Sequence, residues 1–207
     1  MVSVLPTVNV VVEGITDAAV ARRLLGYVGL PCGTVYIKDG KANVLKAVTN
    51  YNQSARLFPW FIIVDLDQKP DCAPDLITTH LPAPNPGMRL RVAVHATESW
   101  LLADARNLAT YLQVPIKKFP GNPDLVKNPK ITLVNLARIS KQKDIREDMV
   151  LPEGRPGTVG PGYSSRVIEF VSLSEAGWRP EVAIQYSDSL RRCVDALRTL
   201  KDWKPVE

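Results

Sequence analysis

The first hundred residues alternate short apolar runs with longer segments whose apolar residues recur at helical spacing. Val8–Val12, interrupted only by Asn9, and residues 60–64 are strongly apolar, as expected of parallel strands buried on both faces. The segments between them predict a helix over 16–28, capped by Thr16, a strand over 34–38 and a helix over 41–54. This β-α-β-α-β order predicts an α/β fold with a Rossmann-like, mostly parallel sheet flanked by helices.

The second half of the chain has a different pattern. Residues 68–87 are rich in proline, which predicts an irregular excursion, and a strand is expected over 89–94. A helix is expected to begin at Thr97. Further helices are expected over 105–112, 131–139, 165–173 and 186–200. We therefore expect an α/β catalytic core over 1–112 and a C-terminal helical, loop-rich extension over 113–207 packed on it.

Composition limits the class of protein only loosely. The 207 residues carry a net charge of +5, which permits binding of phosphates without demanding it. Cys32, Cys72 and Cys193 lie far apart and show neither disulfide nor zinc spacing. No leader peptide and no long apolar run is visible, so a cytoplasmic protein without a membrane segment is expected. The basic residues of the last predicted helix are interpreted as a solvated face.

Four carboxylates follow the two most apolar strands. Glu13 comes directly after the first and Asp17 lies in the next helical turn, while Asp65 and Asp67 come directly after 60–64. Ligands of open parallel sheets gather at the carboxyl ends of strands, so these groups are expected to face one crevice. Carboxylates this close repel one another unless a cation neutralises them, and oxygen ligands suit Mg²⁺ or Mn²⁺. Any one of these residues alone is better explained by a turn or a helix dipole.

Together, the four residues form motifs that resemble a known family. Val-Val-Glu-Gly-Ile-Thr-Asp at 11–17 and Val-Asp-Leu-Asp at 64–67 resemble the two signatures of the TOPRIM domain, in the form found in the OLD-type branch. Asp-Gly-Lys-Ala-Asn at 39–43 resembles the turn that follows the second strand in that domain. Residues 94–104 resemble a segment of small stand-alone bacterial TOPRIM-like proteins that are encoded beside an ATPase and suspected of anti-phage defence.

The resemblance implies a nuclease that hydrolyses phosphodiester bonds, with DNA a more natural substrate than RNA. Glu13 would be a metal ligand and general acid or base, Asp65 and Asp67 metal ligands, Asp17 an extra carboxylate, and Glu98 could complete the site. One or two Mg²⁺ or Mn²⁺ ions would activate water and neutralise the phosphate. Lys41, Lys69 and Lys130 are candidates for the catalytic lysine of the OLD type.

The resemblance also implies a partner. The chain has no Gly-x-x-x-x-Gly-Lys-Ser/Thr motif, so any ATP-driven control of a defence effector would come from a separate ATPase protein. The helical region after Pro115 is the expected contact. The sequence leaves open whether the protein forms oligomers.

Other signals are explained more simply by structure. His80 and His95 are isolated in the sequence, and a lone histidine beside a strand is more often structural than catalytic. The glycines at 157, 160 and 162, with Tyr163 and Arg166, could touch a phosphate backbone, but the prolines between them make a turn-rich loop the simpler interpretation. Trp60, Trp100 and Tyr111 fall in apolar patterns and are expected in the core rather than as stacking platforms for bases.

Two other functions stay open. A phosphatase could use Asp65 as a nucleophile, but Gln68, Lys69 and Pro70 stand where that class of site expects a hydroxyl residue, and Glu13 and Asp17 would have no role. A non-catalytic module that binds nucleic acid or protein is the other alternative. A full set of carboxylates at the motif positions favours the nuclease.

Overall fold

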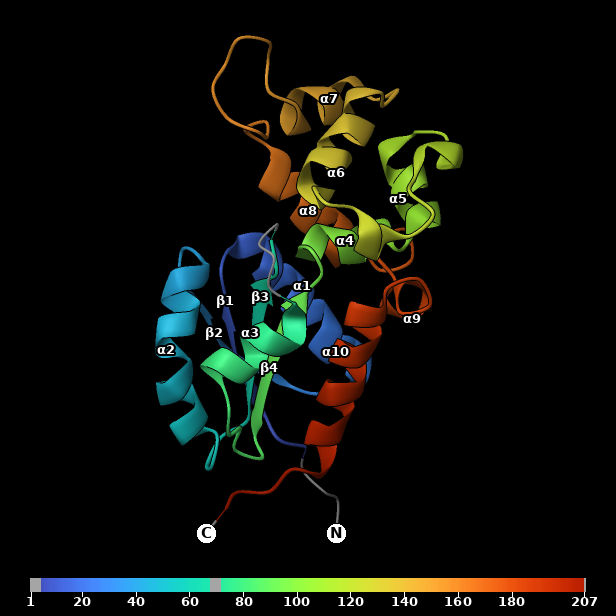
Figure 1. Cartoon of the computed structure of the whole chain (residues 1–207). Coiled ribbons are helices and arrows are strands. Elements are labelled where there is room, and N and C mark those ends of the chain that lie inside the picture. Colours follow the sequence, from blue (N-terminus) through green and yellow to red (C-terminus); the bar gives the residue numbers. More distant parts are fainter. Residues whose placement is uncertain (1–4, 68–71, 207) are drawn as a thin grey trace.

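A computed structural model describes residues 5–67 and 72–206. Four strands and a series of helices follow one another in Figure 1. In chain order the elements are β1 (Val8–Val12), α1 (Ile15–Val28), β2 (Cys32–Ile37), α2 (Lys41–Ser54), β3 (Trp60–Asp65), α3 (Ala73–His80), β4 (Met88–Ala93), α4 (Thr97–Leu102), α5 (Ala105–Leu112), α6 (Pro129–Arg138), α7 (Lys143–Met149), α8 (Tyr163–Ser172), α9 (Pro180–Ala183) and α10 (Asp188–Arg198), with short 3-10 helices η1 (Ile116–Lys118), η2 (Pro123–Leu125) and η3 (Thr199–Asp202).

The strands form one parallel sheet in the order β2-β1-β3-β4. The predicted α/β fold with a helix-flanked parallel sheet is therefore confirmed. β1 pairs with β2 on one side and with β3 on the other, where Val10 lies opposite Phe61. The chain order reverses between β1 and β3, and parallel sheets place their ligand crevices at the carboxyl end of such a switch. Glu13 and Asp65 end these two neighbouring strands, as predicted.

Both faces of the sheet are covered by helices, which explains why the two central strands, β1 and β3, are almost wholly apolar. Val11 and Ile62 face the layer formed by α2 and α3. Val10, Val12 and Phe61 face the opposite layer, to which α1 and α10 belong. Successive residues of a strand point to opposite faces, so a strand buried on both sides has no polar alternation.

Helix starts differ from the sequence predictions at two places near the carboxyl edge of the sheet. α1 is capped by Gly14 rather than Thr16, and the Gly14 N–H donates to Oδ2 of Asp17 at 3.0 Å. α4 is capped by Ala96, while Thr97 is its first helical residue. In both cases the helix begins before the hydroxyl residue expected as its cap, so that residue lies inside the first turn.

The proline-rich segment was predicted to be irregular, and this prediction is wrong for Ala73–His80, which forms α3. Pro74 lies in the first turn of this helix, where a proline costs little because the first amides of a helix have no intrahelical partner. Leu76 is buried against the sheet. Residues 68–71, which include the candidate Lys69, lie outside the described residues.

Residues after 112 take two positions in Figure 1. The helices α6, α7 and α8 lie, with the preceding α5, beyond the carboxyl edge of the strands, and α10 returns beside β4. Leu190 and Leu197 of α10, Val167 of α8 and Phe61 of the sheet belong to one apolar core. The helices α7 and α9, which no sequence prediction named, are short and bury few residues.

The basic residues of α10 are neutralised along their own helix. Arg191 and Arg192 both pair with Asp188, and Arg198 pairs with Asp195. Such exposed pairs, one turn apart, are typical of a solvated helix face. Across residues 5–67 and 72–206, no helix is both long and apolar enough to cross a membrane.

Candidate functional site

Four acidic side chains from different parts of the fold meet at the carboxyl edge of the sheet. We call them the carboxylate cluster: Glu13, Asp17, Asp65 and Glu98. They come from the end of β1, the first turn of α1, the end of β3 and the first turn of α4 respectively. The parallel arrangement of β1, β3 and β4 places all four segments at one edge.

A continuous series of hydrogen bonds links three members of the cluster. Oε1 of Glu13 accepts from the Asp65 N–H at 2.9 Å, and Oδ1 of Asp65 accepts from the Thr97 N–H at 3.0 Å. The Thr97 hydroxyl donates to Oδ1 of Asp17 at 2.7 Å, and the other oxygen of Asp17 accepts from Gly14. These bonds fix the orientation of the carboxylates and connect β1, β3, α1 and α4.

Glu98 is the most deeply buried member, with 3% of its surface exposed. Its Oε1 accepts from the Tyr163 hydroxyl at 2.9 Å and lies 3.7 Å from Nζ of Lys130. Its Oε2 is buried and has no hydrogen-bond partner within the described part of the chain. A buried carboxylate oxygen without a partner is costly, so this atom is the clearest indication that the site receives another group.

The cluster carries charge that the protein itself does not fully compensate. The pKa of Asp65 is raised well above its ordinary value, first by burial and then by the charges of Asp17, Glu98 and Glu13. Burial is also the largest cause of the raised pKa of Asp17 and of Glu13. Glu13, Asp17 and Asp65 therefore favour a proton or a bound cation over a free negative charge.

Lys130 is the cation nearest to the deep part of the cluster. Glu98 is the largest cause of its raised pKa, and Asp65 and Asp17 contribute further. Half of its side chain stays exposed, at the start of α6. Lys130, Lys127, Asp65 and His95 line a cavity of about 330 Å³ above the cluster. This cavity gives a solute access to the carboxylates from the basic side.

Asp67 and Lys41, two other candidates, form a pair beside the cluster. Nζ of Lys41 donates to Oδ2 of Asp67 and to the Leu66 carbonyl, both at 3.0 Å. Asp67 has a left-handed backbone, with φ of 63°, and its side chain is largely exposed. Its charge still raises the pKa of Glu13. The structure thus places Asp67 near the cluster, but with its carboxylate directed to Lys41.

The donor atoms at this edge of the sheet determine which cation the cluster could bind. Among the residues placed in the structure, no three histidine, cysteine, aspartate or glutamate side chains form a ready-made metal site. The donor set consists of carboxylate oxygens, which suits hard cations such as Mg²⁺ and Mn²⁺. The bare Oε2 of Glu98 and the raised pKa values of Asp65 and Glu13 also fit a cation.

The remaining candidates are placed as follows. His80 ends α3, beside a cavity that Lys41 and Asp67 also line. Nδ1 of His95 lies 3.0 Å from the Asp67 carbonyl oxygen, so this ring braces the loop after β3. Gly160 packs on the backbone at the end of α7 so closely that a Cβ would lie 2.4 Å from the Asp148 carbonyl oxygen, which explains it structurally.

Two residues that hold the cluster make contacts that the sequence does not predict. Thr97 was interpreted as a helix cap, although its hydroxyl binds Asp17. Tyr163 received no role in binding carboxylates, because its helix begins 65 positions after Glu98 and only the packing of α8 brings it there. Trp100 and Trp60 are buried, as predicted for core residues.

Comparisons of the chain with protein-family models, with curated proteins and with solved structures find no match. The geometry and chemistry of the carboxylate cluster therefore carry the functional argument.

Proposed function

We propose that the protein is a Mg²⁺- or Mn²⁺-dependent nuclease that hydrolyses phosphodiester bonds, with DNA preferred to RNA, and that the carboxylate cluster is its active site. The observation that carries the proposal is the buried Oε2 of Glu98, which has no partner from the described residues beside three carboxylates of raised pKa. Groups held in this way form a site for cations rather than a stabilising element of the core. The TOPRIM-like motifs at 11–17 and 64–67 support the same function.

Glu13, Asp65 and Glu98 are the residues that would hold the metal, with Asp17 as a further ligand or as a buttress for Thr97. A bound divalent ion would supply a polarised phosphate oxygen and an activated water. We expect the carboxylates to move closer together around the ion when it binds, because they repel one another without it.

The residues around the cluster have roles of their own in this proposal. Lys130 and Lys127 present ammonium groups at the cavity and would bind the phosphate that approaches the carboxylates. Tyr163 and Thr97 orient Glu98 and Asp17 through their hydroxyls. Glu13, half-buried and with a raised pKa, would carry the proton that leaves the attacking water.

The phosphatase alternative is less well supported. That class of site expects a hydroxyl residue soon after the second aspartate, where Gln68, Lys69 and Pro70 stand. A phosphatase of that type also gives no role to Glu13. A non-catalytic binding module stays as the second alternative, and the cleavage assay decides between them.

We further propose, from the resemblance, that the nuclease is a cytoplasmic defence effector controlled by a partner ATPase. The helices beyond Pro115 would contact the partner, leaving the cavity over the cluster open. Co-expression with the product of the neighbouring gene, followed by size-exclusion chromatography and cleavage with and without ATP, tests this. A nuclease that cuts at full rate alone and does not co-elute would contradict it.

The main experiment is a cleavage assay on purified protein with labelled single- and double-stranded DNA and RNA, in Mg²⁺, Mn²⁺ or EDTA, with a phosphate monoester in parallel. We expect cleavage of the polymer in metal, none in EDTA and no release of phosphate from the monoester. Asp65→Asn and Glu98→Gln should each abolish cleavage. Asp75→Asn, which changes an exposed aspartate of α3, is the matched control and should cut normally.

A further inference from the structure

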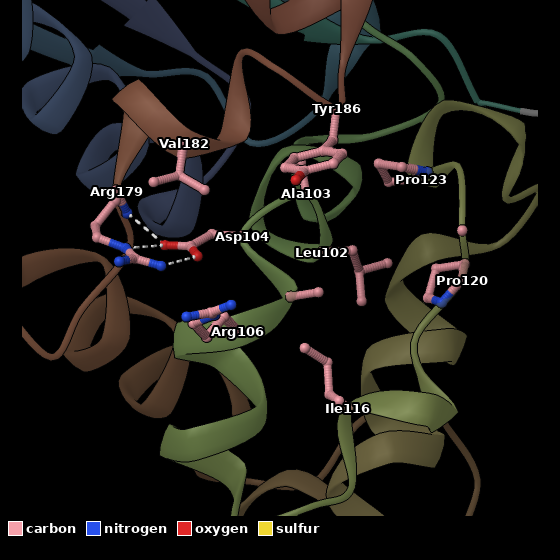
Figure 2. A pocket seen from close by; sticks show the side chains of 12 residues that line it. Leu102, Ala103, Asp104, Arg106, Ile116, Pro120, Pro123, Arg179, Val182 and Tyr186 are labelled. Atoms are coloured by element: carbon pink, nitrogen blue, oxygen red, sulfur yellow. Dashed lines mark hydrogen bonds and ion pairs between the residues drawn. The ribbon is translucent and has the colours of Figure 1, made fainter.

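We infer that a cavity at the far end of α4 from the cluster holds one nucleotide of a single-stranded substrate. This nucleotide cavity has a volume of about 470 Å³ and lies between the start of α5, η1, η2 and α9. Figure 2 shows Tyr186, Leu102, Ile116 and Arg106 arranged around it. Its volume is that of a pocket for a small organic ligand.

One side of the nucleotide cavity is aromatic and apolar. Tyr186 and Ile116 are each 56% exposed there, and Pro120 and Pro123 add flat apolar walls. Exposed tyrosine rings stack well on bases, because a base offers a flat face whatever its sequence. A nucleobase therefore fits this wall better than a charged or flexible group does.

The other side carries one uncompensated positive charge. Asp104 is fully buried, and its oxygens accept from Nε and Nη2 of Arg179 at 2.9 and 2.7 Å, so that pair is neutral (Figure 2). Arg106 is exposed and pairs with no carboxylate of the described ranges. A free planar guanidinium beside an aromatic wall suits a nucleotide, whose phosphate it can bind through two N–H groups.

The nucleotide cavity is connected to the cluster by a basic segment. Residues 116–131 line this cavity at one end and the cavity over the cluster at the other. The segment contains four lysines, at 117, 118, 127 and 130, and a single carboxylate, Asp124. Asp124 is turned inward, where it accepts from the Ser187 hydroxyl and the Ser189 N–H. The charged groups that the segment exposes are thus the four lysines, which suits a polyanion.

The spacing of the two cavities suits a strand of nucleic acid. The six residues of α4 separate them, with Thr97 at the cluster and Leu102 at the nucleotide cavity. A helix of this length is about 9 Å long, which about three stacked nucleotides span. A duplex would keep its bases stacked inside, whereas a single strand can place one base in the cavity. The inference rests on the proposed nuclease function and adds its substrate class.

Binding of a short labelled single-stranded oligonucleotide in EDTA, followed by fluorescence anisotropy, tests the inference without cleavage. Tyr186→Ala and Arg106→Ala should each weaken binding roughly tenfold, and Tyr186→Phe should keep it. Phe58→Ala and Arg56→Ala are matched controls, because Phe58 is 57% exposed, Arg56 is also exposed and both lie after α2, far from the cavity. Both controls should bind as the unchanged protein does.

Three results would overturn the inference: unchanged binding in both cavity variants, equal binding of duplex and single strand, or binding of a free nucleoside monophosphate at the cavity without binding of the strand. Thermal unfolding of each variant verifies that it is folded. The Mg²⁺ cleavage assay of the unchanged protein tests the nuclease function separately from this binding assay. A protein that binds strands through Tyr186 and never cuts them would have the nucleotide cavity without the proposed activity.

Discussion

The Thr97 hydroxyl donates a hydrogen bond of 2.7 Å to Oδ1 of Asp17, a residue 80 positions earlier in the chain. The backbone N–H of Thr97 meanwhile donates to Asp65. One residue at the start of α4 thus orients carboxylates from α1 and from β3. Thr97 thus links Asp17 and Asp65 across the proposed metal site, so its substitution perturbs both carboxylates.

Thr97→Val should destabilise the protein by about 1–3 kcal/mol, because it leaves a buried oxygen of Asp17 without its donor while keeping the side-chain shape. Urea unfolding measures the change. Thr78→Val is the control, since the Thr78 hydroxyl bonds a carbonyl of its own exposed helix. Equal losses for the two variants would contradict a special role for Thr97.

Asp65→Asn should stabilise the metal-free protein, and the gain should grow with pH. The pKa of Asp65 is raised in the folded state. Well below its ordinary pKa of 3.8, folded and unfolded chains both hold the proton. As pH rises, the unfolded chain releases its proton first, so the unchanged protein loses stability until pH passes the raised pKa. The asparagine variant lacks this loss.

Urea unfolding in EDTA between about pH 4 and pH 8 measures the difference between the two proteins. Mg²⁺ should reduce the advantage of the variant at the higher pH, because the ion binds the ionised carboxylate. A variant that is less stable than the unchanged protein at neutral pH in EDTA would contradict this account of the cluster.

The pattern of apolar runs was sufficient to predict the fold and to bring Glu13 and Asp65 together. Strands buried on both faces are recognisable because they lack polar alternation, and parallel neighbours place their carboxyl ends at one edge. The sequence did not predict α3, because prolines usually interrupt helices. Pro74, however, occupies the first turn of α3, where a proline is compatible with a helix.

The details of the candidate site depended on packing between distant segments. Tyr163 reaches Glu98 because α8 packs beside the sheet's carboxyl edge, and no local pattern records that contact. Asp67 is directed to Lys41 because its left-handed backbone turns the side chain toward α2, and motif spacing does not report a backbone angle. Spacing predicts which residues gather, while side-chain directions follow from the three-dimensional fold.

Arg179→Met should cost about 3–5 kcal/mol of folding stability, because it leaves the fully buried Asp104 without a compensating charge. Arg106→Met changes an exposed arginine of the same cavity that has no carboxylate partner in the described chain, and it should cost less than about 0.5 kcal/mol. Chemical unfolding of both variants gives the comparison. Similar losses would show that the Asp104 and Arg179 pair is not the structural element of this cavity.

Tyr163→Phe should destabilise the protein by about 1–3 kcal/mol, because it removes the hydroxyl donor from Oε1 of the buried Glu98. Lys130, at 3.7 Å, would then be the nearest donor to that atom among the described residues. Tyr111→Phe is the matched control, since the Tyr111 hydroxyl bonds Glu169, whose side chain is 46% exposed, and it should cost less.

A double-mutant cycle separates the contact with Glu98 from general packing at Tyr163. In a Glu98→Met background there is no carboxylate to satisfy, so Tyr163→Phe should cost much less than in the unchanged protein. Mg²⁺ should stabilise the unchanged protein more than Glu98→Met, because only the former offers the free Oε2 to the ion. If the losses of stability are strictly additive and Mg²⁺ affects both proteins equally, Glu98 is not part of the proposed metal site.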